Sequence, residues 1–253
     1  MARNVVILDL ETRHSAEDCR HCGTPQTHHQ PLSSVCIVKS GPDNAPLSQF
    51  EKIGWDNHAA LGLSIGGYFD YASQRMVWFD EDMLEETVRH FVETKPLIVG
   101  FNSIQFDLSL ILALLENQAE HLSDYERLQL MDLCASFRHL FSTSYDILAE
   151  IWQADPERKF ERGLNSLDAL ARANGLGGKI GHGAQAPRDW QAGRIARVVN
   201  YCQDDVLKTV QLFEMINETH GWLKRGDGSW IGIRYYDHLT ETLLPPGTKP
   251  DDG

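Results

Sequence analysis

Asn4-Val-Val-Ile-Leu-Asp-Leu-Glu-Thr12 is an apolar run that carries two carboxylates near its end, Asp9 and Glu11. The run of branched apolar residues predicts a buried strand over residues 4–10. Side chains alternate between the two faces of a strand, so Asp9 and Glu11 should project to the same side. Ligand sites of open α/β sheets form at the carboxyl ends of strands, which is where both acids lie.

Two further acidic motifs follow along the chain. The first, Gly100-Phe-Asn-Ser-Ile-Gln-Phe-Asp107, leads into an apolar helical pattern that shares one face with Asp107. The second, Tyr201-Cys-Gln-Asp-Asp205, places Tyr201 and Asp205 one helical turn apart, beside an apolar stripe. Carboxylates on apolar elements are costly to bury unless cations compensate them. A pair of divalent ions would do so, and such pairs catalyse phosphodiester cleavage.

The order of these motifs resembles the DEDD 3′–5′ exonucleases, in their tyrosine variant. An Asp-x-Glu, an aspartate that opens a helix and a Tyr-x-x-x-Asp follow one another between about Val5 and Phe213. Within that group, the chain resembles the predicted exonucleases related to the proofreading domain of family B DNA polymerases. The resemblance implies an α/β fold of the ribonuclease H-like type, with a mixed β-sheet flanked by helices.

The same resemblance implies a metal-dependent 3′–5′ exonuclease that uses a two-metal-ion mechanism. Its substrate would be a single-stranded DNA or RNA 3′ end, with DNA as the expected choice. Two Mg²⁺ or Mn²⁺ ions are implied, since hard oxygen ligands suit those ions. Their expected ligands are Asp9, Glu11, Asp107 and Asp205. Tyr201 would position the nucleophilic water through its hydroxyl. Asp204 is the alternative to Asp205, but it lies three residues from Tyr201 instead of four.

Each motif alone also fits a structural role. Asp9 and Glu11 suit a capped turn. Asp107 suits the positive N-terminus of a helix, and Tyr201 and Asp205 suit a solvated helix face. The structural roles together require three coincidences in the right order, so the sequence favours the nuclease. The alternative is a nucleic-acid-binding or assembly module with weak or no nuclease activity, against which the presence of all four acids argues.

The composition is that of a globular protein. Of its 253 residues, 42% are hydrophobic and 23% are charged, which is ordinary for a folded domain. No apolar run approaches the ~18 residues of a membrane span, so no membrane partner is expected. Five cysteines suit a reducing interior better than a disulfide framework, so we expect a cytoplasmic location. A replication or repair protein would be a partner consistent with the proposed activity.

The charge distribution suggests where nucleic acid would bind. The net charge of −13 argues against nucleic acid, but the distribution matters more than the sum. Residues 158–197 carry eight Lys and Arg against three Asp and Glu, so this basic segment is the expected phosphate-contacting surface, with a charge-mixed solvated face as the alternative. The expected nucleic-acid-binding residues are Asn102, Phe106, Lys179 and Arg188. Phe106 fits base stacking or core packing, and Lys179 lies in a glycine-rich stretch that fits a mobile loop or a plain linker.

A Cys/His-rich stretch follows the first strand. It begins with Cys19-Arg-His-Cys22, and Cys-x-x-Cys is typical of half a zinc site. The expected ligands are Cys19, Cys22, Cys36 and one of His28 or His29. Residues 13–56 form an insertion of about 40 residues, too long for an ordinary loop, and a zinc knuckle would give it a core of its own. The irregular spacing leaves reduced thiols or a redox pair as alternatives.

The remaining pattern predicts further elements and a division of the chain. The predicted elements are strands over 59–69 and 75–79, a helix over 81–93, a strand after Pro96, a helix from Ile104, a short strand over Leu128–Leu133, a helix capped by Ser166 and ended by Gly175, a long helix from about Asp189 to Glu218, a hairpin between Leu223 and Tyr236, and a disordered end after Leu244. We expect residues 1–222 to form the ribonuclease H-like domain, interrupted by the insertion, and residues 223–253 to form a C-terminal hairpin and flexible tail.

Overall fold

The protein is built around a five-stranded mixed sheet. The computed structural model describes residues 3–20, 52–178 and 185–250. The strands are β1 (Val5–Thr12), β2 (Leu63–Asp70), β3 (Arg75–Phe79), β4 (Leu97–Gly100) and β5 (Tyr145–Asp146), in the order β3-β2-β1-β4-β5. β2 is antiparallel to β1 and β3, whereas β1, β4 and β5 are parallel. This α/β arrangement confirms the predicted ribonuclease H-like fold.

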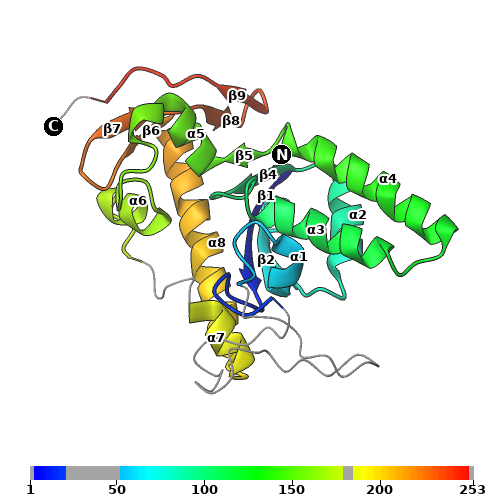
Figure 1. The fold of residues 1–253 in the computed structure, drawn as a ribbon. Coiled ribbons are helices and arrows are strands. Elements are labelled where there is room, and N and C mark those ends of the chain that lie inside the picture. The colour runs from blue at the N-terminus through cyan, green and yellow to red at the C-terminus, as the bar shows by residue number, and fades with distance from the viewer. Residues whose placement is uncertain (1–2, 21–51, 179–184, 251–253) are drawn as a thin grey trace, which may run out of the picture.

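Helices cover the sheet in two groups, which Figure 1 shows to either side of it. One group is α1 (His58–Leu61), α2 (Leu84–Thr94), α3 (Asp107–Ala119) and α4 (Asp124–Phe141). The other is α5 (Ile147–Ala154), α6 (Leu167–Ala173) and α8 (Ile195–Glu218), with α7 (Ala186–Gln191) before α8 and a short 3-10 helix (Pro156–Arg158) after α5. None of the helices within the described ranges is long and apolar enough to cross a membrane.

The alternation of side chains along β1 separates two hydrophobic clusters. Val6, Leu8 and Leu10 belong to the cluster that includes α2, α3 and α4. Val5 and Ile7 belong to the cluster that includes α5, α6 and α8. Because alternate residues share a face, Asp9 and Glu11 continue the second row. The row that is apolar at the start of β1 therefore becomes acidic at its end, on the side of α8.

Gly67 allows α8 to lie close to this acidic end of β1. It pairs with Asp9 across β1 and β2. A Cβ atom at Gly67 would lie 2.6 Å from the Trp78 ring and 3.3 Å from the Cys202 Sγ of α8. The Cys202 thiol in turn donates to the Asp9 carbonyl oxygen at 3.3 Å. A larger residue at position 67 would push α8 outward, so glycine here sets the spacing between the strand and the helix.

Two helical segments differ from the sequence prediction. Leu128–Leu133 lies within α4 and is not a strand, because Ser123 and Glu126 form a capping box at the start of that helix. Its buried stripe of Leu130, Leu133 and Phe137 has helical spacing. Residues 59–61 likewise belong to α1, which the Asn57 side chain caps, and β2 begins only at Leu63.

The predicted long helix from Asp189 to Glu218 is also wrong, because it is two helices. Gly193 has a φ of +71°, a left-handed conformation that favours glycine. The Arg194 N–H donates to the Asp189 carbonyl oxygen at 2.8 Å, and the Gly193 N–H donates to the Trp190 carbonyl oxygen at 2.9 Å. These two bonds form a Schellman motif, which ends α7 and redirects the chain into α8.

The C-terminal part of the chain packs against the second hydrophobic cluster. The predicted hairpin is formed by β6 (Trp222–Lys224) and β7 (Trp230–Gly232), and a second hairpin follows with β8 (Tyr235–Asp237) and β9 (Thr242–Leu244). After Leu244, where the sequence predicts disorder, Gly247 makes two hydrogen bonds. Its N–H donates to the His220 carbonyl oxygen at 2.7 Å, and its own carbonyl oxygen accepts from the Trp222 indole at 2.9 Å. These two hydrogen bonds hold the chain at Gly247 against the segment between α8 and β6.

Candidate functional site

Three carboxylates from distant parts of the sequence meet at the end of β1. One oxygen atom from each of Asp9, Glu11 and Asp205 lies within 4.8 Å of the other two. Glu11 is buried, and Asp9 and Asp205 are half-buried. β1 supplies two members because alternate strand residues share a face, and α8 supplies the third. This carboxylate group (Asp9, Glu11 and Asp205) contains Asp205 and not its neighbour Asp204.

Asp107 lies beside the carboxylate group as the first residue of α3, and only 4% of it is exposed. Its Oδ1 accepts the Leu10 N–H at 2.9 Å. β4 pairs with β1 only as far as Ile7. Beyond that point, at Leu10, the Asp107 carboxylate lies beside β1 in place of β4. Burial raises the pKa of Asp107 to about 8, and the nearby charges of Asp146 and Asp205 act in the same direction.

Asp146 is a buried carboxylate of this region that motif reasoning missed. Its two oxygens accept the N–H groups of Asn102 and Ile104 at 2.9 and 3.0 Å, and the same side chain caps α5. Burial raises the pKa of Asp146, while these backbone hydrogen bonds lower it. Asp146 thereby fixes the loop that leads into Asp107. The available sequence signal was an aspartate placed directly before the apolar helical run of α5.

Tyr201 lies on α8, one turn before Asp205, and is half-buried. Asp189, a residue of α7, lies near enough that Tyr201 helps to lower the pKa of its carboxyl against the opposing effect of burial. Asp189 is fully buried and forms an ion pair with Arg194 at 2.6 Å. Sequence reasoning assigned no role to Asp189, because its burial arises from the way α7 folds back on α8.

The predicted nucleic-acid-binding residues occupy different surroundings. Asn102 has a φ of +63° in the loop before α3, and its N–H is held by Asp146. Phe106 is half-buried, with its ring centroid 6.1 Å from that of Trp55, which is 63% exposed. Arg188 is exposed on α7, and Lys179 lies outside the described residues. The structure thus places an exposed indole against Phe106, the residue that precedes Asp107 in the sequence.

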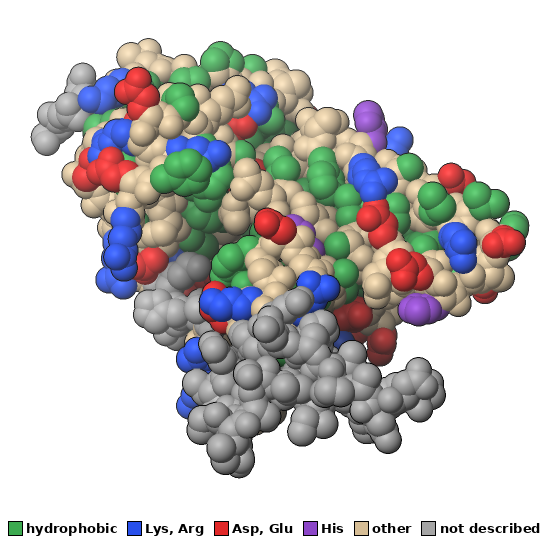
Figure 2. All heavy atoms as spheres, in the orientation of Figure 1, with side chains coloured by type: hydrophobic (Ala, Val, Ile, Leu, Met, Phe, Trp, Pro, Cys, Tyr) green, Lys and Arg blue, Asp and Glu red, His purple; other side chains and the backbone are tan. Residues whose placement is uncertain are grey.

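Within the described part of the chain, three of the eight basic residues in the basic segment, residues 158–197, form ion pairs. The pairs are Arg158 with Glu161 and Asp227, Arg172 with Asp168, and Arg194 with Asp189. On the face drawn in Figure 2, Lys and Arg side chains are interspersed with acids and form no single basic patch. Among the described residues of the segment, Arg162, Arg188 and Arg197 are the exposed arginines that lie outside these pairs. The segment therefore offers fewer cations to a phosphate backbone than its composition indicates.

The predicted zinc ligands fall almost entirely outside the described residues. Cys22, His28, His29 and Cys36 are in that part of the chain. Cys19 is described, and it is buried with a free thiol. It also forms an isolated antiparallel bridge with Lys52. The two chain segments on either side of residues 21–51 are therefore held together.

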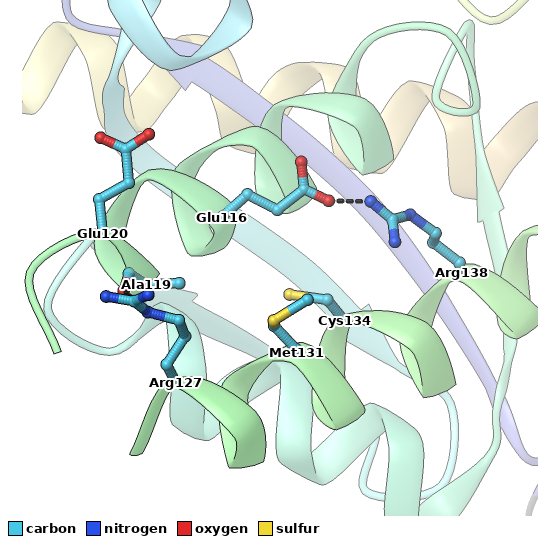
Figure 3. A pocket seen from close by; sticks show the side chains of 7 residues that line it. All are labelled: Glu116, Ala119, Glu120, Arg127, Met131, Cys134 and Arg138. Atoms are coloured by element: carbon cyan, nitrogen blue, oxygen red, sulfur yellow. Dashed lines mark hydrogen bonds and ion pairs between the residues drawn. The ribbon is translucent and has the colours of Figure 1, made fainter. Parts of the chain in front are cut away.

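A cavity of about 480 Å³ lies between α3 and α4. Figure 3 shows the side chains of Glu116, Met131 and Cys134 around it, with an ion pair between Glu116 and Arg138. Neither the carboxylate group nor Tyr201 lines this cavity. It is therefore separate from the candidate site.

Comparison with known proteins agrees with this geometry. A family model described as a predicted 3′–5′ exonuclease related to the exonuclease domain of PolB matches residues 73–229, more than half of the 253 residues. A search of curated proteins finds no match to this chain. Asp107, Tyr201 and Asp205 lie inside the matched segment, whereas the Asp9 and Glu11 of β1 precede it and are joined to it by the fold. The chain belongs to the family of predicted 3′–5′ exonucleases related to the exonuclease domain of PolB.

Proposed function

We propose that this protein is a metal-dependent exonuclease that removes nucleotides from the 3′ end of single-stranded nucleic acid, with DNA as the preferred substrate. The carboxylate group carries the proposal. Three acidic oxygens within 4.8 Å of one another repel unless a cation lies between them. In a chain of this family, such a group is the expected place for the ions that hydrolysis requires.

The residues present fit Mg²⁺ or Mn²⁺. All of the ligand atoms in the carboxylate group are hard oxygens, which these ions prefer. A cation held there would favour the charged form of the neighbouring Asp107, whose pKa burial raises to about 8. We propose that the carboxylate group and Asp107 together hold two such ions. When bound, the ions supply charge stabilisation for the attacking and leaving oxygens of the displacement.

The direct test is digestion of a labelled single strand by the purified protein. A 5′-labelled oligonucleotide should give a ladder that shortens with time, and a 3′-labelled one should release labelled mononucleotide at once. Both reactions should require Mg²⁺ or Mn²⁺ and stop with a chelator. Parallel DNA and RNA strands decide the substrate preference. Binding of both strands without any metal-dependent shortening would instead support the alternative, a nucleic-acid-binding module.

We propose that Trp55 and Phe106 form the surface that contacts the bases near the 3′ end. Phe106 directly precedes Asp107, and the exposed Trp55 ring lies against it. Aromatic stacking contributes about 1–3 kcal/mol per base. Trp55→Ala should therefore weaken oligonucleotide binding by roughly 5- to 150-fold, measured by fluorescence anisotropy with Ca²⁺ in place of Mg²⁺.

Tyr125→Ala is the matched control for this substitution. Tyr125 is also an exposed aromatic residue, at 71%, but it lies on α4. It should leave the binding affinity near the wild-type value. Equal affinity losses in the two variants, or none in Trp55→Ala, would remove Trp55 from the binding surface.

We also propose a structural zinc ion in the insertion, bound by Cys19, Cys22, Cys36 and one of the two histidines at 28 and 29. The bridge between Cys19 and Lys52 supports this proposal, because it closes the base of the segment that would enclose the ion. Four protein ligands leave no open position, so the ion would stabilise structure only. Elemental analysis of protein purified without added metal should find about one zinc per chain, lost in Cys22→Ser/Cys36→Ser and kept in the control Cys134→Ser. A zinc content near zero in the wild type contradicts it.

A further inference from the structure

We infer that two copies of this protein pair through the exposed face of α4, with the two helices antiparallel. The residues of this face, here called the α4 stripe, are Asp124, Leu128, Met131, Ala135 and Arg138. A two-fold axis passes between the two Met131 side chains, so each Asp124 meets the Arg138 of the other copy. Such a pair uses the same surface on both copies and is closed. It is independent of the proposed exonuclease function, since no member of the carboxylate group belongs to α4.

The spacing of the α4 stripe places all of its residues on one side of the helix. They are exposed, and they follow one another at alternating intervals of four and three residues. This is the spacing of the contact seam between two helices that pack side by side along their length. The buried residues of α4 lie on its other side, which packs against α2 and α3. α4 lies at the right-hand edge of the molecule in Figure 1, so a second helix could lie along the stripe.

The middle of the α4 stripe is apolar although it is exposed. Leu128 is 63% exposed and Met131 is 57% exposed. In an antiparallel pair centred on Met131, the Leu128 of one copy lies near the Ala135 of the other, so a large side chain meets a small one. Met131 also lines the cavity between α3 and α4, where Figure 3 shows it beside Cys134. This cavity gives the flexible methionine side chains of the two copies room to pack around the axis.

The two ends of the α4 stripe carry opposite charges at equal distances from its middle. Asp124 and Arg138 each lie seven residues from Met131, which is about 10 Å along the helix axis. An antiparallel pair therefore forms two ion pairs between the copies, whereas a parallel pair would bring like charges together. Exposed ion pairs contribute little net free energy, so these two pairs select the orientation. Burial of the apolar middle supplies the affinity.

Glu116 of α3 orders the arginine that this pairing uses. Its carboxylate forms an ion pair with Arg138, which Figure 3 draws, while 54% of the Arg138 side chain stays exposed. A guanidinium has five N–H donors, so Arg138 can bind Glu116 and the Asp124 of the other copy at the same time. An arginine that is already held loses less side-chain entropy on association.

The length of α4 limits the strength of the pair. Its 18 residues span about 27 Å. One pair of such helices buries less than the roughly 1,200–2,000 Å² of a standard stable interface. We therefore expect a reversible dimer with a dissociation constant in the micromolar range.

Sedimentation equilibrium of the full chain over a wide concentration range tests this pairing. The wild type should show a reversible equilibrium between monomer and dimer. Asp124→Arg places two arginines together at each end of the stripe, so it should raise the dissociation constant by about 10-fold or more. Asp124→Arg/Arg138→Glu exchanges the two charges and should restore dimerisation toward the wild-type value.

Asp132→Arg is the matched control, because it makes the same change on an exposed residue of α4 that lies outside the stripe. Its dissociation constant should stay near that of the wild type. A wild-type protein that is monomeric at every concentration would overturn the pairing. So would equal dissociation constants in Asp124→Arg and Asp132→Arg, or an exchange variant no tighter than Asp124→Arg. Since all of these positions are exposed, each variant should keep the unfolding temperature of the wild-type monomer. Absence of cleavage by the wild type would contradict the proposed function and leave this result unchanged.

Discussion

Asp205→Asn is expected to lower the rate of 3′–5′ cleavage by more than about 100-fold. Replacing a residue that merely hydrogen-bonds to a metal ligand already lowers metal affinity or activity by about 10- to 100-fold, and Asp205 is proposed to be a ligand itself. Asp9→Ala should have a comparable effect. Asp204→Asn is the matched control, since it makes the same change one residue away on α8 but lies outside the carboxylate group. The measurement is the initial rate of shortening of a 5′-labelled strand at saturating Mg²⁺.

The fold of Asp205→Asn should survive, and its response to metal should change. Without metal, the substitution removes one of three crowded negative charges, so its unfolding temperature should equal or exceed that of the wild type. Ions that bind only the native state raise the wild-type unfolding temperature as their concentration rises. This rise should be much smaller in Asp205→Asn. A near wild-type rate together with an undiminished metal response would contradict the assignment of Asp205 as a ligand.

The parts of the site that the sequence predicted are those that follow from local periodicity. Asp9 and Glu11 share a face because a strand has a period of two, and Asp205 follows Tyr201 by one helical turn. The distance between these pairs is a tertiary property. It depends on Gly67, which admits the Cys202 of α8 next to β1, and no pattern in the sequence reveals that contact.

The errors in the predicted secondary structure also arise where local periodicity does not determine the structure. A short apolar run such as Leu128–Leu133 fits a strand or a buried helix equally well by periodicity, and only the capping box at Ser123 and Glu126 distinguishes them. Gly193 within the predicted long helix is a residue type that commonly ends a helix, so this break could have been predicted from the sequence. The burial of Asp189 that results from the break could not have been predicted, because it depends on where α7 packs.

Tyr201→Phe is the second substitution with a large expected effect, and it should act on the chemical step alone. The variant keeps the ring on α8 and removes only the hydroxyl. If that hydroxyl orients the nucleophilic water, the single-turnover rate should fall by roughly 10²–10⁴, the range for positioned groups that handle a proton in the transition state. Oligonucleotide affinity should barely change, because the base-contacting surface at Trp55 and Phe106 is untouched.

The rise in unfolding temperature with Mg²⁺ then distinguishes the role of Tyr201 from that of the carboxylate group. Because Tyr201 lies outside the carboxylate group and supplies none of its oxygens, Tyr201→Phe should keep the full rise in unfolding temperature with Mg²⁺. Asp205→Asn should lose both the rate and that rise. Tyr235→Phe, a half-buried tyrosine on β8, controls for loss of a hydroxyl elsewhere. A single-turnover rate in Tyr201→Phe equal to that of Tyr235→Phe would mean that Tyr201 serves packing, and that the water is oriented by another group.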